Sequence, residues 1–286
     1  NHPYSAPTPP FGILPQNTFG THSLKELYPK MPTIPYSDII QAAQAAGDAI
    51  MTVYQKDFEV YQKNDDSPLT EADLAAHRVI VDALQHLTPD LPILSEESEN
   101  APWDERKTWD RYWLVDPLDG TKEFVKKNDE FTVNIALIEH GEPTWGVVDA
   151  PALGCTYHGG TATQGAWKSV NGQDTPITVS KAPANNTGWR IVGSRSHQSD
   201  AFKAFLDDFD APEIKSMGSS LKICLIAEGE ADLYPRLGPT SEWDTGAAHA
   251  VLLGAGGQLN LAESGEPLRY NQEESVLNPF FIARGA

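Results

Sequence analysis

Residues 113–124, WLVDPLDGTKEF, are the stretch that most limits how this chain can fold. Its apolar start predicts a buried strand, which leads into Asp116 and Asp119, separated by a proline and a leucine. Proline fixes φ and has no amide for a strand ladder, so we expect the backbone to turn directly after Asp116. Gly120 and Thr121 then begin a new segment whose free amide groups can hold an anion.

Two carboxylates at such a corner can share a buried proton, lie on the surface, or bind hard divalent cations, which take oxygen ligands. Ordinary turns use the same residue types, so this stretch alone does not decide. Three further acidic stretches favour metal. ILSEES ends a short predicted strand with Glu96 and Glu97, SEWDTGAAHAVLLGAGG begins a predicted helix with Asp244, and SPLTEADLAAH begins another with Asp73. Such groups meeting unpaired in a low-dielectric cleft would repel strongly, whereas a bound cation would attract them.

Composition bounds the other possibilities. The 286 residues, 40% of them hydrophobic, suffice for one large domain or two modest ones. No apolar run approaches the roughly 20 residues of a membrane helix, and we expect a soluble protein. Cys155 and Cys224 form no metal or redox motif, so we expect buried reduced thiols, which suit the cytoplasm. The net charge of −19 argues against binding nucleic-acid polymers. It fits an acidic surface and carboxylates that face cations.

Helical and strand patterns are mixed along the chain, which predicts an α/β (α+β) protein. The helices that we expect cover residues 37–54, 70–87, 199–208, 219–229 and 244–253. The strands that we expect contain LPIL, YWLV, the hairpin FTVNIALIEHGEPTWGVVDAP, WRIVGS, GQLNLAES and NPFFIAR. A weak boundary is expected near residues 155–190, where Gly, Thr and Asn concentrate. We place an N-terminal α+β half at 31–155 and a C-terminal α/β half at 156–286.

Residues 1–30 differ from the rest, because they are rich in Pro, Gly and Thr and show little periodicity. Met31 then precedes the first helical pattern. We expect residues 1–30 to be a flexible leader, either added ahead of a native start at Met31 or a native arm.

The three acidic blocks together resemble a known superfamily. SEES, WLVDPLDGTKEF and EWDTGAAHAV match, in this order, the signature blocks of the magnesium-dependent, lithium-sensitive phosphatases related to inositol monophosphatase and fructose-1,6-bisphosphatase. The resemblance extends from about residue 35 to the C-terminus. It implies a layered αβαβα sandwich and hydrolysis of a phosphomonoester by water that two or three Mg²⁺ ions activate.

The resemblance also implies a role for each acidic position. The metal ligands that it assigns are Glu96, Asp116, the backbone carbonyl of Leu118, Asp119 and Asp244. It assigns the positioning and deprotonation of the attacking water to Asp73 and Thr121. Two simpler roles stay open: Thr121 as a helix-capping hydroxyl, and Asp73 as a charge at a helix start. Glu97 is open between a supporting and a structural role.

Two later segments distinguish among phosphate esters. SRSHQSD (194–200) and MGSSLKICLIAEGEADLYPR (217–236) resemble segments of the CysQ-type 3′(2′),5′-bisphosphate nucleotidases, which convert adenosine 3′,5′-bisphosphate to AMP. Hydroxyls, amides and a lysine at a helix start form a second anion-binding corner, as two separated phosphates require. The substrate contacts implied are Gly120, Thr121, His197, Ser219, Ser220, Lys222 and Arg236. The simpler roles are a surface histidine, capping serines and a solvated lysine.

The sequence therefore predicts a Mg²⁺-dependent nucleotidase, with phosphoadenosine phosphosulfate as a second substrate. One alternative is an inositol monophosphatase or inositol polyphosphate 1-phosphatase, which shares the metal site. The other is a metal-dependent nucleotide sensor with little catalysis. We expect a cytoplasmic monomer that binds a small nucleotide, and no membrane span.

Overall fold

The computed structural model describes residues 33–56, 59–62, 68–193 and 199–286. The predicted leader and His197 lie outside this part. Residues Pro35–Ala286 form one compact unit. The boundary that we predicted near residue 155 falls inside this unit, within a sheet that continues from one predicted half into the other.

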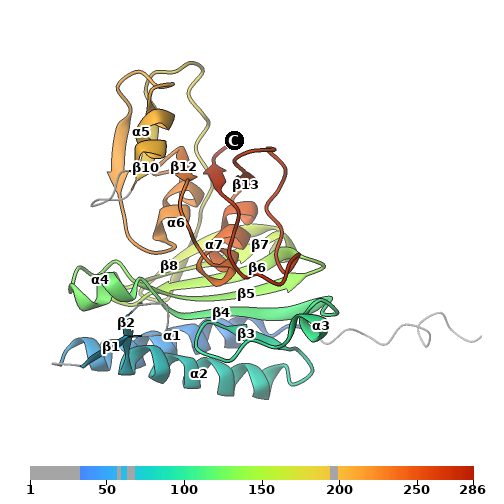
Figure 1. Ribbon diagram of the computed structural model, residues 1–286. Coiled ribbons are helices and arrows are strands. Elements are labelled where there is room, and N and C mark those ends of the chain that lie inside the picture. Colours follow the sequence, from blue (N-terminus) through green and yellow to red (C-terminus); the bar gives the residue numbers. More distant parts are fainter. Residues whose placement is uncertain (1–32, 57–58, 63–67, 194–198) are drawn as a thin grey trace, which may run out of the picture. The chain divides into compact units, whose positions relative to one another are not determined.

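The unit contains helices and strands in mixed order (Figure 1). The helices are α1 Tyr36–Tyr54, α2 Glu71–Leu87, α3 Trp103–Arg106, α4 Thr121–Val125, α5 Asp200–Leu206, α6 Leu221–Ala227 and α7 Glu242–Gly254. The short pair of strands is β1 Val60–Gln62 and β2 Pro68–Thr70. The strands of the larger sheet are β3 Ile93–Ser95, β4 Arg111–Asp119, β5 Thr132–Glu139, β6 Glu142–Ala150, β7 Cys155–Gly160, β8 Gly165–Val170 and β9 Gln173–Pro176. The strands of the smaller sheet are β10 Arg190–Gly193, β11 Glu213–Ser216, β12 Leu233–Arg236, β13 Gln258–Leu261 and β14 Phe281–Arg284.

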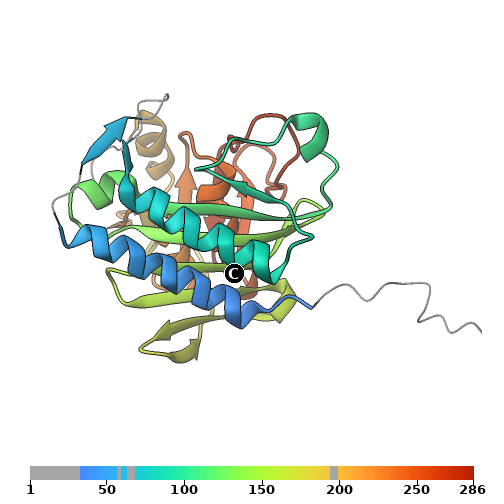
Figure 2. The same ribbon diagram turned by 90° about the horizontal axis from the view of Figure 1, so that it is seen from below.

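The larger sheet has seven strands in sequence order, with β3 parallel to β4 and all later pairs antiparallel. The smaller sheet has the order β11-β10-β12-β14-β13. Helices α1 and α2 lie side by side across one face of the larger sheet (Figure 2). Helices α6 and α7 lie between the two sheets, and α5 packs on the smaller sheet through Phe202. These layers confirm the predicted αβαβα architecture.

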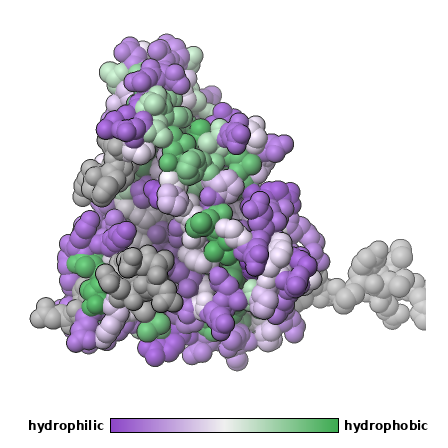
Figure 3. All heavy atoms as spheres, in the orientation of Figure 1, coloured by the Kyte–Doolittle hydropathy of each residue, from purple (hydrophilic) through white to green (hydrophobic). Residues whose placement is uncertain are grey.

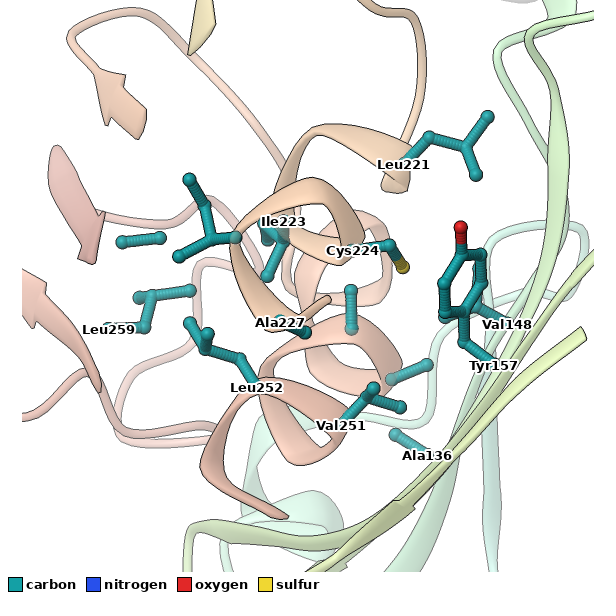
Figure 4. Close-up of a cluster of buried hydrophobic side chains, with 14 of the residues drawn as sticks. Ala136, Val148, Tyr157, Leu221, Ile223, Cys224, Ala227, Val251, Leu252 and Leu259 are labelled. Carbon is teal, nitrogen blue, oxygen red and sulfur yellow. The ribbon is translucent and has the colours of Figure 1, made fainter. Parts of the chain in front are cut away.

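The central layer explains the composition of α7. A helix with a sheet on either side has no solvent face, so it must be apolar nearly all round. Ala247, Ala248, Val251 and Leu252 are accordingly buried in a single cluster with residues of both sheets. Figure 4 shows Leu252 beside Ala227 of α6 and Leu259 of β13, and Val251 beside Ala136 of β5.

The surface agrees with the charge of the chain. Hydrophilic residues cover most of the face seen in Figure 3, and the net charge is −19. Cys155 and Cys224 are both free and buried, as expected. Within the described ranges, no helix has the length and apolar character that crossing a membrane would take.

Strand β4 corrects one prediction. We expected the backbone to turn directly after Asp116, yet β4 continues to Asp119. The pairing with β5 shifts between Asp116 and Asp119, so the chain accommodates Pro117 as an irregularity of the ladder rather than as its end. Both aspartates therefore remain attached to the larger sheet.

A glycine sets the distance between the larger sheet and the central helices. Gly146 of β6 lies against the backbone of α7, where a Cβ atom would come within 2.4 Å of the Ala247 carbonyl oxygen. The contact brings α7 close to the sheet, and the first turn of α7 carries Asp244.

We predict that Gly146→Ala lowers the free energy of unfolding by about 1–3 kcal/mol, because the added methyl group must push α7 away from β6. Urea unfolding followed by circular dichroism measures the loss. Gly238→Ala is the matched control, since a Cβ atom there meets nothing within 4 Å. Equal stability of both variants would contradict this account of the packing.

Candidate active site

Three carboxylates from separate elements meet beside the end of β4. Glu96, Asp116 and Asp244 each offer an oxygen atom, and these atoms lie within 4.8 Å of one another. Glu96 directly follows β3, whose ladder continues through a hydrogen bond from the Glu96 amide to the Val115 carbonyl (3.1 Å). Because β3 and β4 are parallel, their carboxyl ends reach the same edge, where α/β proteins place their sites.

Asp244 reaches this cluster from the first turn of α7. Its Oδ2 atom accepts a hydrogen bond from the Ser241 amide (2.8 Å), which closes a capping box. The cap fixes the carboxylate at the helix start, where the helix dipole favours negative charge.

Burial and mutual repulsion raise the pKa values of this cluster. Asp116 is 1% exposed, and burial raises its pKa well above the usual range, with the Glu96, Asp119 and Asp244 carboxylates adding to the effect. Burial raises the pKa of Asp119 to about 6, although Lys222 and the Ser220 amide oppose the shift. Burial, followed by the charge of Asp119, raises the pKa of Asp244 to about 8.

These residues fit divalent cations. The Oδ2 atom of Asp116 is buried and has no hydrogen-bond partner among the described residues, whereas its Oδ1 atom accepts from the Leu118 amide (3.1 Å). Hard cations such as Mg²⁺ and Ca²⁺ prefer such all-oxygen surroundings. A cation here would offset the repulsion that otherwise keeps protons on these acids.

Asp73 and Thr121 are brought together beside the cluster. Asp73 lies in the first turn of α2, and its Oδ2 atom accepts from the amide (2.8 Å) and the hydroxyl (2.7 Å) of Thr70. Its Oδ1 atom lies 3.2 Å from the Thr121 hydroxyl, which is also 3.2 Å from the Leu118 carbonyl oxygen. One oxygen of Asp73 thus closes a capping box at the start of α2, while the other faces Thr121. Thr121 caps no helix, because Gly120 is the N-cap of α4.

Gly120 is required at this corner. Its φ is +89°, in the left-handed region, and a Cβ atom there would lie 3.0 Å from the Glu130 carbonyl oxygen and 3.3 Å from the Cβ of Ser219. The end of β4 and the start of α6 therefore approach closely because this residue has no side chain.

A cavity of about 650 Å³ opens at the same corner. Its walls include Asp119, Gly120, Ser219, Lys222, Arg236 and Asp244. A smaller cavity, of about 220 Å³, shares Lys222, Tyr234 and Arg236 with it. The Lys222 Nζ atom lies 3.3 Å from the Ser219 carbonyl oxygen and 6.0 Å from the Tyr234 ring centroid. The lining of the cavity therefore combines two carboxylates, Asp119 and Asp244, with two cationic side chains, Lys222 and Arg236.

Ser220 also lines the cavity, but its hydroxyl is engaged within the protein. Its hydroxyl is buried and donates to the Asn134 Oδ1 atom (2.8 Å), while the Thr132 hydroxyl lies 2.8 Å away. We did not predict a role for Thr132 or Asn134. The signal was present in FTVNIALI, where two polar residues occupy alternate positions of an otherwise apolar strand.

The raised pKa values predict how stability depends on pH. Unfolded aspartate loses its proton near pH 4, whereas folded Asp119 and Asp244 lose theirs near pH 6 and pH 8. The folded state therefore binds more protons in this window, so the free energy of unfolding of metal-free protein should fall as pH rises from about 4 to about 8.

Urea unfolding in EDTA across this window tests the slope, and saturating Mg²⁺ should raise the stability at pH 8. Asp116→Asn should flatten the slope, whereas Asp207→Asn, a change at an exposed aspartate, should not. A metal-free protein that gains stability with rising pH would refute the repulsion.

Comparison with known proteins agrees with this geometry. A family model described as the inositol monophosphatase family matches residues 36–280. A protein of Salmonella typhimurium named 3′(2′),5′-bisphosphate nucleotidase CysQ is 52% identical over 246 residues, which are 85% of this chain and 96% of that protein. The protein of the same name from Escherichia coli K12 is 51% identical with the same coverage.

Solved structures show the same similarity. The crystal structure of CysQ from Bacteroides thetaiotaomicron, described as a bacterial member of the inositol monophosphatase family, matches with a TM-score of 0.76 and 40% identity. The match covers 87% of this chain and 96% of that one. An IMPase from Thermotoga maritima matches with a TM-score of 0.71 and 27% identity, over 87% and 91% of the two chains. This chain belongs to the inositol monophosphatase family.

Proposed function

We propose that the protein is a Mg²⁺-dependent 3′(2′),5′-bisphosphate nucleotidase that hydrolyses the 3′-phosphate of adenosine 3′,5′-bisphosphate to give AMP. The observation that carries the proposal is a cavity whose lining combines carboxylates with cationic side chains. Asp119, Gly120 and Asp244 line it together with Lys222 and Arg236. Asp244 belongs to the carboxylate cluster, and Thr121, which follows Gly120, meets Asp73. Relatives named bisphosphate nucleotidases, 51–52% identical over 85% of this chain, support the same substrate class.

The carboxylate cluster and the neighbouring Asp119 suit the phosphate that is cleaved. We assign Glu96, Asp116, Asp119, Asp244 and the Leu118 carbonyl to two or three Mg²⁺ ions. When bound, such ions lower the pKa of water and neutralise charge on the phosphate and on the leaving oxygen.

The Asp73–Thr121 pair suits the activation of water. With its proton directed to Asp73 Oδ1, the Thr121 hydroxyl leaves lone pairs that accept a hydrogen bond from the attacking water. The water proton can then pass through Thr121 to Asp73 as the water oxygen bonds to phosphorus and the bond from phosphorus to O3′ of the ribose breaks. The released O3′ then takes up a proton from water. Asp73 is suited to receive it because Thr70 holds its other oxygen in place. The amides of Gly120 and Thr121 would bind the remaining phosphate oxygens.

Lys222 and Arg236 suit the phosphate that is kept. Lys222 and Arg236 line both cavities, so a 5′-phosphate lying between them would receive two charge-assisted contacts. Ser219, which lines the larger cavity, is a third candidate contact. Ser220 would act indirectly, since its hydroxyl is occupied within the protein.

The alternatives predict a different site. A phosphatase for inositol 1-phosphate binds one phosphate and does not need Lys222 and Arg236 to bind a second one. A nucleotide sensor has no need for the Asp73–Thr121 pair.

We further expect phosphoadenosine phosphosulfate to be a second substrate, and the protein to be a cytoplasmic monomer. Light scattering of the purified protein tests whether it is a monomer.

Phosphate release tests the reaction. We expect faster turnover of adenosine 3′,5′-bisphosphate than of inositol 1-phosphate, activity that requires Mg²⁺, and complete loss in EDTA. Li⁺ should inhibit. Faster turnover of the inositol ester would overturn the assigned substrate, and activity that persists in EDTA would overturn the mechanism.

Variants of the water-activating pair test the chemistry. Thr121→Ala and Asp73→Asn should each lower kcat by about 10²–10⁴-fold, because proton transfer is lost. Thr121→Ser keeps the hydroxyl and should retain most of the activity. Calorimetric titration with AMP should show that all three variants still bind product.

Lys222→Met tests the second phosphate. At saturating Mg²⁺, KM for adenosine 3′,5′-bisphosphate should rise about 10–100-fold, the effect of losing one hydrogen bond to a charged group. KM for 3′-AMP, which lacks the 5′-phosphate, should change little. Lys203→Met, at an exposed position of α5, is the matched control. An equal rise for both substrates would remove Lys222 from the 5′-phosphate site.

A further inference from the structure

A buried hydrogen-bond network joins Asp119, beside the carboxylate cluster, to the start of α6. Asp119 of β4 accepts from the Ser220 amide (2.6 Å) and from the Asn134 side-chain amide (3.4 Å), both at its Oδ2 atom. Ser220 also reaches Asn134 through its hydroxyl, at 2.8 Å. Asn134 is 1% exposed and Ser220 is 3% exposed. The three residues thus close a ring of hydrogen bonds between β4, β5 and α6.

The direction of each bond follows from chemistry. A carboxylate only accepts, so the Nδ2 group of Asn134 must face Asp119 and its Oδ1 atom must face Ser220. The Ser220 hydroxyl therefore donates to Asn134, and the Thr132 hydroxyl, which lies 2.8 Å from it, donates to Ser220. Each of these side chains has a partner that suits it, so the network permits one arrangement.

The network gives the two carboxylate oxygens of Asp119 different surroundings. Both of its hydrogen bonds from described residues reach Oδ2, so Oδ1 is the atom left for a cation. A turn of the carboxylate plane toward a cation would break the 2.6 Å bond to the start of α6 unless another group held the plane. Asn134 is placed to hold it, because it contacts both partners of that bond.

We propose that Asn134 is a positioning residue that ties the orientation of Asp119 to the start of α6, so that cation binding and binding of the substrate's second phosphate favour each other. The inference rests on the proposed function. Ser219 and Lys222 flank Ser220 and line the cavity, so fixing the Ser220 backbone also fixes the two groups offered to the phosphate. Asn134 itself lines neither of the two cavities described above.

Two variants separate positioning from packing. Asn134→Ala removes both contacts with Asp119 and Ser220. Thr132→Val removes only the donor to Ser220 and keeps its shape, so the ring to Asp119 stays intact. Both remove a hydrogen bond from a buried polar group, and both should lower the melting temperature.

Isothermal titration of Mg²⁺, with and without saturating AMP, measures the coupling. In the wild-type protein AMP should tighten Mg²⁺ binding, within the 5–150-fold range common for linked sites. In Asn134→Ala, Mg²⁺ alone should bind about 10-fold more weakly, as expected when a ligand loses a supporting hydrogen bond. AMP should then tighten it less than threefold. Thr132→Val should keep the wild-type affinity and coupling.

Equal Mg²⁺ affinity and equal coupling in Asn134→Ala and wild type would overturn the inference, whatever the melting temperatures. Equal losses in both variants would also overturn it, because the cause would then be general loosening of the strand. Failure of the proposed function gives a different result: wild-type protein would bind Mg²⁺ without any response to AMP. The Mg²⁺ affinities of the two variants would still decide whether Asn134 positions Asp119.

Discussion

Repulsion among buried and half-buried carboxylates at the end of β4 is the constraint on which the rest of the structure depends. Glu96, Asp116, Asp119 and Asp244 come from three separate regions of the chain, and burial in low dielectric raises the pKa of the three aspartates. Backbone amides offset part of this cost at Asp116, Asp119 and Asp244, each of which accepts a hydrogen bond from one. The large apolar core around α7 offsets the rest of the cost of placing these carboxylates together.

The central helix layer links this cluster to the substrate cavity. The first turn of α7 carries Asp244, and the start of α6 and the two residues before it carry Lys222, Ser219 and Ser220. Cations on the carboxylates would reverse the local sign for an anionic substrate, and Lys222 and Arg236 also line the cavity. The net charge of −19 argues against binding nucleic-acid polymers, and it is compatible with the nucleotide substrate that we propose.

Much of the fold was predictable because its elements carry local signals. The helix predicted over residues 37–54 is observed at Tyr36–Tyr54, since its apolar spacing matches a helical face. Asp73 and Asp244 were predicted at helix starts, and each lies in the first turn of its helix, where it closes a capping box. The turn expected after Asp116 was wrong, because pairing with β5 resumes beyond the shift and carries the strand past Pro117.

The sequence by itself determined the five longer helices, several strands and the acidic blocks, since periodicity and strand-end carboxylates depend on residues close together in the chain. Only the tertiary structure decided what Ser220 does. Its amide meets Asp119 and its hydroxyl meets Asn134, residues 101 and 86 positions away. Such contacts depend on how β4, β5 and α6 pack, and no local pattern encodes the distance between elements so far apart in sequence.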